Sequence, residues 1–162
     1  MRKLIDVAAA LAGGALGTFL MQRMLKVAPK LPESLKPPEA SGDPGHFMVD
    51  KAERLIGRRL PAGAEDALAK SLQWAYGMTF PIALGLLAER IGRRRIGRVL
   101  AAGAAMGALT WAVGYLGWLP ATGLVRPIHR QKPTRTASAL VSHLAYGTVA
   151  AVPLALTGRF VA

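Results

Sequence analysis

Histidine is the residue type in this chain best suited to proton transfer or metal ligation, and it occurs at His46, His129 and His143. Only His143 lies within a long apolar segment, where a polar side chain usually faces protein rather than lipid. It could serve as an axial ligand of haem, but no other apolar segment contains a second histidine. We therefore expect His143 to be hydrogen-bonded inside a helix bundle, and we keep a haem-binding redox protein as an alternative.

Two similar sequence patterns place polar side chains on two of the apolar segments. Gln73 precedes an Ala-Tyr-Gly triplet that contains Tyr76, and His143 precedes a second one that contains Tyr146. Residues three apart share a helix face, so each pair can point in the same direction. We expect these four side chains to be the polar groups of the bundle interior.

The sequence lacks the arrangements that are typical of an enzyme. The acids Glu33, Glu39 and Asp43 lie near His46 and His129 along the chain or across the predicted loops, and could in principle assemble an acid–base or metal site. There is no HExxH motif, no close pair among these acids, no nucleophile motif and no cysteine. We predict a protein that is not an enzyme and has no metal site.

These residues are carried by four apolar blocks of about twenty residues each, long enough to cross roughly 30 Å of hydrocarbon as helices. Hydrophobic residues make up 52% of the 162-residue chain, and the mean hydropathy is +0.30. We predict an all-α integral membrane protein, a four-helix bundle forming one domain over 1–162. The predicted membrane helices cover about 4–26, 66–88, 97–119 and 137–157.

The connections between these helices differ in character. Residues 27–45 form a proline-rich loop, and 46–60 alternate apolar and charged side chains at helical spacing, which predicts an amphipathic helix in the headgroup layer. A surface helix that touches no lipid is the alternative. The loop 89–97 is rich in arginine, and the loop 120–136 is also basic.

Basic residues indicate the orientation in the membrane. Five arginines among residues 89–98, together with Arg2 and Lys3, predict that this side is cytoplasmic, so that both termini lie in the cytoplasm. The basic loop 120–136 would then lie on the opposite side, against the usual charge bias.

Nucleic acid is not an expected partner despite the net charge of +12, because the charges flank apolar spans and suit anionic lipid headgroups.

Two further groups of residues suggest contact surfaces. The pairs Gly13/Gly17 and Gly103/Gly107 have the small-xxx-small spacing that lets helices approach closely. We expect these four glycines to be helix-packing positions that serve association with a larger membrane complex or self-association. The second group combines basic side chains with turns in the predicted loops, which suits an anionic headgroup or an acidic partner loop; it comprises Lys36, Arg126, His129 and Arg130.

The order of these features suggests a tandem duplication of a two-helix hairpin. Each half has a glycine pair, a loop that opens with Leu-Pro, an Ala-Tyr-Gly triplet and a later proline, Pro81 or Pro153. Two such hairpins in tandem would have the same orientation, so that both proline-containing loops would meet on one face. Chance recurrence in a chain rich in Ala and Gly is the alternative.

Three further stretches characterise the layout: GGALGTFLMQ at 13–22, PKLPESLKPPE at 29–39 and the later helices with Ala-Tyr-Gly. In these stretches the chain resembles YagU-like bacterial inner-membrane proteins, which are small multipass proteins of unknown biochemical role. The resemblance implies a bacterial inner membrane, and no functional residues can be carried over.

These observations favour a non-catalytic protein, an accessory or assembly subunit that packs against a larger membrane complex. One alternative is a small homodimeric transporter or channel built around Gln73, Tyr76, His143 and Tyr146. The haem-binding redox protein is the second alternative.

Overall fold

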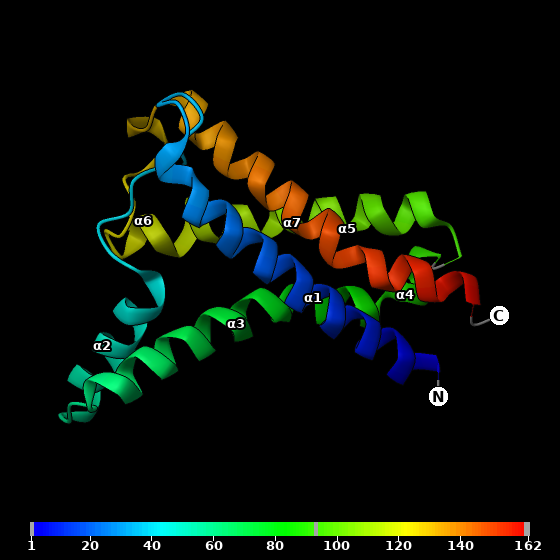
Figure 1. The fold of residues 1–162 in the computed structure, drawn as a ribbon, viewed down its shortest axis with the longest axis horizontal. Coiled ribbons are helices and arrows are strands. Elements are labelled where there is room, and N and C mark those ends of the chain that lie inside the picture. The colour runs from blue at the N-terminus through cyan, green and yellow to red at the C-terminus, as the bar shows by residue number, and fades with distance from the viewer. Residues whose placement is uncertain (1, 93, 161–162) are drawn as a thin grey trace.

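The computed structural model describes residues 2–92 and 94–160, and the regular elements of this part are all helices (Figure 1). Four are long: α1 (Arg2–Val27), α3 (Ala62–Leu86), α5 (Ile96–Trp111) and α7 (Pro133–Phe160). The shorter elements are η1 (Ala28–Lys30), α2 (Pro44–Ile56), α4 (Ala88–Ile91), the π-helical η2 (Ala112–Trp118), α6 (Leu119–Ala121) and η3 (Ile128–Arg130). The all-α prediction is confirmed.

Three helical segments are long and apolar enough to cross a membrane: Arg2–Lys30, Ile96–Ala121 and Pro133–Gly158. The prediction had a fourth span at about 66–88, and helix α3 does occupy this region. It carries Lys70, Gln73 and Thr79 along its length, and it is not among the three segments that meet the length and hydropathy expected of a span.

The long helices pack in the order α5, α7, α1 and α3, with α7 lying between α5 and α1 (Figure 1). Helices α3 and α5 come together at the end of the molecule that holds both termini, where Leu84 and Ala88 pack with Val99 and Leu154. From there α3 runs away from α5 towards the loops. The bundle is therefore closed at one end and open between α3 and α5 at the other.

The predicted glycine pairs pack inside this bundle. A Cβ atom at Gly13 would overlap the carbonyl of Ala150, and one at Gly17 would lie 2.9 Å from the Tyr146 ring. On α5, Gly103 and Gly107 meet the backbone of α7 in the same way. Helix α7 of the same chain therefore covers both pairs, and a role of these glycines in association with a larger complex stays a prediction.

Local sequence explains where α2 begins and ends. Asp43 is its N-cap, with a side-chain oxygen 3.0 Å from the backbone N–H of His46, and Pro44 takes the first helical position. Gly57 ends the helix with φ +70°, a conformation that glycine adopts without strain. Helix α2 packs against the first half of α3, at the loop end of the molecule (Figure 1).

The proline-rich segment 31–43, here called the strap, is held against the loop 119–132 and the start of α7. Arg135 of α7 forms ion pairs with Glu33 at 2.5 Å and with Glu39 at 2.6 Å. The backbone N–H of Ser41 donates to Leu124 O at 2.8 Å, next to the isolated bridge of Ala40 with Val125. The strap thus joins the first loop region to the second.

Two local features depart from simple predicted helices. The span predicted at 97–119 is α-helical only to Trp111, and continues as the π-helix η2, with a non-helical conformation at Gly117. The predicted loop 89–97 contains the short helix α4 and turns at Gly92. Arg93 of that basic loop lies outside the described residues.

Candidate functional site: a cavity between the helices

A cavity of about 200 Å³ lies at the loop end of the bundle, where α3 has separated from α5. Its walls come from α1, α3, α7 and the continuous segment α5–η2–α6, and the beginning of α2 closes one side with Pro44, Gly45 and Met48. Most of the lining surface is apolar, with contributions from Met21, Leu25, Leu72 and Leu119. This is the composition of a site for an apolar molecule held by a few polar contacts.

The structure brings Gln73, Tyr76, His143 and Tyr146 together as lining residues of this one cavity. Tyr146 donates a hydrogen bond from its hydroxyl to the backbone carbonyl of Gly77, which joins α7 to α3. The four side chains meet within a single chain, so the cavity is formed without a second copy. Their functional role remains a prediction.

The polar groups of the cavity differ in whether they are already hydrogen-bonded. The Nδ1 atom of His143 lies 2.8 Å from Ala139 O; a carbonyl can only accept, so Nδ1 carries the proton and Nε2 is the acceptor. Thr18 is 5% exposed, and its Oγ1 has no hydrogen-bond partner among the residues that the structure describes. The amide of Gln73 can both donate and accept.

The π-helix η2 shapes the wall opposite α3. A π-helical turn is wider than an α-helical one and is often found at functional sites. Tyr115 of η2 lines the cavity and meets the His143 ring edge-on, with the ring centroids 5.8 Å apart. Trp118, also in η2, contacts Tyr76 of α3 with centroids 6.4 Å apart. Aromatic rings thus bridge the gap between α3 and η2.

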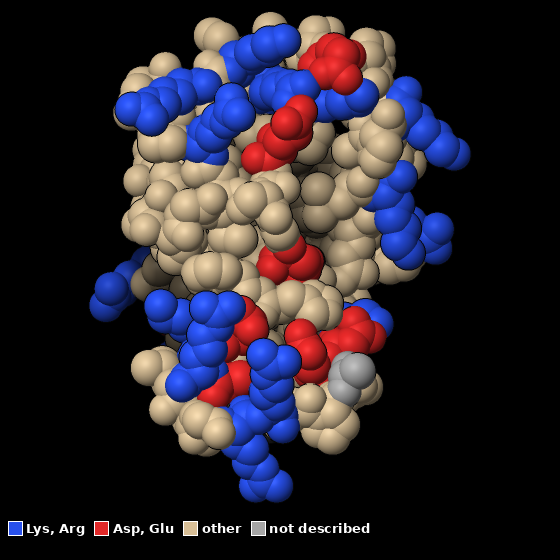
Figure 2. Space-filling view, turned by 90° about the vertical axis from the view of Figure 1, so that its left-hand side faces the viewer, with Lys and Arg blue, Asp and Glu red and all other residues tan. Residues whose placement is uncertain are grey.

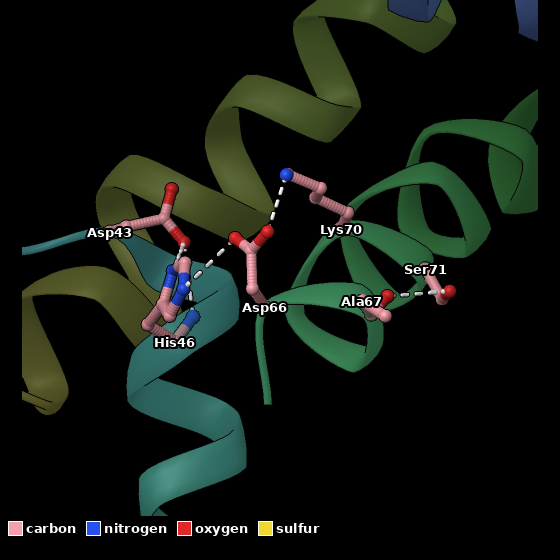
Figure 3. A network of polar contacts seen from close by, with 6 residues as sticks. All are labelled: Asp43, His46, Asp66, Ala67, Lys70 and Ser71. Carbon is pink, nitrogen blue, oxygen red and sulfur yellow. Dashed lines mark hydrogen bonds and ion pairs between the residues drawn. The ribbon is translucent and has the colours of Figure 1, made fainter. Parts of the chain in front are cut away.

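A polar network outside the cavity fastens α2 to α3 (Figure 3). The imidazole of His46 lies between two carboxylates, with Nδ1 3.0 Å from Asp43 and Nε2 3.5 Å from Asp66. Lys70 forms a further ion pair with Asp66 at 2.5 Å. We call these four residues the clasp. Next to it, a Cβ atom at Gly45 would lie 2.6 Å from Ala69 O, so that α2 touches the backbone of α3.

The acids around His46 change its titration. The hydrogen bond to Asp43, and the negative charges of Asp43, Asp66 and Glu65, raise the pKa of His46 above its usual 6.5. Partial burial opposes ionisation of Asp43, yet the hydrogen bonds from the backbone N–H and ring of His46 leave the pKa of Asp43 below its ordinary value. The charged form of His46 therefore holds the clasp more strongly.

The predicted loop contacts lie apart from the cavity, and the structure groups only some of them. Arg126 and Arg130 line a recess of about 270 Å³ together with Lys132 and Arg135. Lys36 instead pairs with Glu33 at 2.5 Å on the strap, and His129 is exposed on η3 outside the recess lining.

One buried acid was not singled out from the sequence. Asp6 of α1 is 1% exposed, at the end of the bundle that holds the termini, and its backbone approaches Gly85 of α3. A carboxylate within an apolar segment is a recognisable signal in the sequence, because charged groups at such positions usually face protein.

Haem at His143 stays a prediction. The cavity of about 200 Å³ is smaller than the roughly 300–1,000 Å³ usual for pockets that enclose drug-sized ligands, and a porphyrin is larger still. No second histidine lines the cavity, and the described part of the chain holds no cluster of three or more metal-ligating side chains.

Comparison with protein-family models, curated proteins and solved structures finds no match for this chain. The resemblance to YagU-like proteins stays a prediction. The fold itself defines the class: an all-helical protein with three helices suited to a membrane, and a small apolar cavity among its helices.

Proposed function

We propose that this chain is a non-catalytic membrane protein that binds a slender apolar molecule with one hydroxyl or carbonyl group in the cavity beneath α2. The observation that carries the proposal is the convergence of Gln73, His143 and Thr18 on a cavity whose lining is otherwise mainly apolar. A hydroxyl can donate to Nε2 of His143, and either group can accept from the Gln73 amide. A single hydrocarbon chain suits the cavity's small volume.

The proposal places the protein in a bacterial inner membrane, with α3 as a fourth span. Helix α3 packs along α1 and α1 is one of the three apolar spans, which supports a similar depth for both. The N- and C-terminal ends lie at the same end of the molecule (Figure 1), as an even number of spans requires. Ser71 and Thr79 donate to backbone carbonyls one turn earlier, which lowers the cost of placing them in lipid.

The arginine-rich segment 89–98 connects α3 and α5 at the end that holds both termini, which supports a cytoplasmic location for this end (Figure 1).

The packing of two glycines supports the proposed duplication of a two-helix hairpin. In each hairpin the glycine of Ala-Tyr-Gly faces the preceding long helix, with Gly77 against Thr18 and Gly147 against Gly103.

Ligand-dependent stability tests the proposed binding. The unfolding midpoint of the protein in lipid nanodiscs is measured with increasing decanol and, separately, with decane. Decanol should raise the midpoint more than decane does, because binding to the folded state stabilises it and only the alcohol can bond to His143 and Gln73. An equal effect of both probes would count against the polar contacts.

Two variants on one helix make that test specific. Leu72 lines the cavity and Leu68, one turn earlier, does not, so Leu72→Trp should abolish the stabilisation by decanol while Leu68→Trp keeps it. If Leu72→Trp responds to decanol as the wild type does, the alcohol acts outside the cavity and the proposal fails.

An accessory subunit of a larger membrane complex is the second candidate function, and the exposed apolar side of α2 favours it. Leu55 is 80% exposed and Ile56 75% exposed, although α2 lies outside the three apolar spans. The helix can lie on lipid or on a partner. Because the glycine pairs are covered, a partner would contact this surface.

Co-purification tests this candidate function. Loss of co-purifying membrane subunits in Leu55→Ser/Ile56→Ser would support it, and unchanged co-purification would oppose it.

A further inference from the structure

The recess between the strap and the start of α7 is strongly basic. Its lining includes four cationic side chains and a single acid, Glu39, together with Pro38, Val125 and Gln131; the four cations are Arg126, Arg130, Lys132 and Arg135. Its volume is about 270 Å³, and it is open to solvent on the loop end of the molecule. Figure 2 views this end and shows basic side chains gathered above a band of uncharged surface.

Three of these cationic side chains form no ion pair with an acidic side chain of the described residues. Arg126, Arg130 and Lys132 are exposed, and none forms an ion pair with any acid in the part of the chain that the structure describes. Arg135 differs, because both ends of its guanidinium group are held by Glu33 and Glu39, and its side chain is only 14% exposed. Arg135 and the strap therefore form one side of the recess. The three exposed cations can bind an anion that lies against this side.

The position of the recess along the chain sets its depth relative to lipid. The second apolar span ends at Ala121 and the third begins at Pro133, so Arg126, Arg130 and Lys132 connect two membrane segments. This is the level of lipid headgroups. A small basic hollow at that level matches the size and charge of a phosphate group more closely than it matches an extended polymer.

We propose that this recess binds the phosphate group of an anionic phospholipid, with Arg126 and Arg130 as its principal ligands. The inference depends on the membrane location of the chain, and it is independent of the cavity beneath α2. It also gives a reason for a basic loop opposite the arginine-rich segment 89–98: these charges bind lipid rather than set the orientation.

Lipid retention tests the proposal. The full chain is purified in mild detergent, mixed with equal amounts of phosphatidylglycerol and phosphatidylcholine, and the retained lipids are counted by native mass spectrometry. The wild type should retain one phosphatidylglycerol in preference to phosphatidylcholine. In Arg126→Gln/Arg130→Gln this preference should fall roughly thirtyfold, the loss expected for two basic side chains close to an anionic headgroup.

The control is Arg58→Gln/Arg59→Gln, which removes two exposed arginines from the segment after α2, outside the recess lining. It should retain phosphatidylglycerol as the wild type does, and equal loss in both double variants would overturn the proposal, since net charge alone would explain it. Inorganic phosphate is the second probe. Displacement of phosphatidylglycerol by millimolar phosphate would show a site for the free ion and overturn the lipid assignment, whereas retention supports it.

Discussion

The hydroxyl of Tyr146 on α7 donates a hydrogen bond to the backbone carbonyl of Gly77 on α3, so that one Ala-Tyr-Gly triplet bonds to the other. Tyr146 is 4% exposed, and its ring also packs against Gly17 of α1. A single side chain therefore links three of the four long helices at the edge of the cavity.

Loss of this hydroxyl should weaken the bundle without disturbing its packing. We expect Tyr146→Phe to lower the free energy of unfolding by about 1 kcal/mol, the usual contribution of one buried hydrogen bond. Thermal unfolding followed by circular dichroism in detergent measures the change. Tyr115→Phe is the control, because Tyr115 lines the same cavity but its hydroxyl has no hydrogen bond within the described part of the chain. Equal losses in both variants would show that the Gly77 contact contributes nothing specific.

Close approach of α5 and α7 depends on glycine. In Gly107→Ala the new methyl group would overlap the carbonyl oxygen of His143, so the helices must separate and the stability should fall by about 1–3 kcal/mol. Gly97→Ala on the same helix is the control, since a Cβ atom there meets no other atom within 4 Å. It should be neutral or slightly stabilising, because alanine favours helix more than glycine does. Similar destabilisation by both substitutions would contradict the packing of α5 on α7.

The clasp should loosen as the pH rises. Because the pKa of His46 is raised in the folded state, its stabilisation is complete below the unfolded value of 6.5 and is lost as the pH rises through the folded pKa. The groups facing His46 are Asp43, Asp66 and Glu65, with Lys70 paired to Asp66. We expect α2 to be held less firmly against α3 at pH 8 than at pH 5.5.

Spin labels can measure this change, since the chain has no native cysteine to remove. Labels at Lys51→Cys on α2 and Ser71→Cys on α3 should give a narrow distance distribution at pH 5.5 and a broader one at pH 8. Adding His46→Gln should make the distribution independent of pH over this range. A pH dependence that persists in His46→Gln would assign the effect to another group.

The ion pairs of Arg135 should protect the strap from proteolysis. Arg135→Gln removes the contacts to both Glu33 and Glu39, so a protease that cleaves after glutamate should cut the strap faster, while the helix content stays unchanged. Lys36→Gln is the control, because it removes only the local pair with Glu33. Cleavage that is no faster in Arg135→Gln than in Lys36→Gln would show that other contacts hold the strap.

Helix caps, apolar length and small-residue spacing predicted much of this fold, because each depends on residues that are close together in the sequence. Asp43-Pro44 starts α2 where the cap preference places it, and apolar length identifies α1, α5 and α7. The small-residue spacing at Gly103 and Gly107 does identify a packing face. It cannot specify which helix covers that face, and the partner is α7 of the same chain rather than another protein.

The open end of the bundle could not be predicted, because it depends on contacts between distant segments. The cavity arises from the divergence of α3 from α5, the π-helix at η2 and the position of α2, and none of these has a local pattern of its own. The spacing of Gln73, Tyr76, His143 and Tyr146 placed each pair on one helix face, and all four line the cavity, with Tyr76 38% exposed. The pairing of Arg135 with the strap joins residues about a hundred positions apart.

The most direct test of the account is native mass spectrometry of the protein purified in mild detergent from its own membrane, with the wild type, Leu72→Trp and Leu68→Trp measured side by side. The account predicts one apolar molecule with a hydroxyl or carbonyl group bound per chain in the wild type and in Leu68→Trp, and none in Leu72→Trp. An empty wild-type chain, or the same molecule retained in all three proteins, would contradict ligand binding in the cavity.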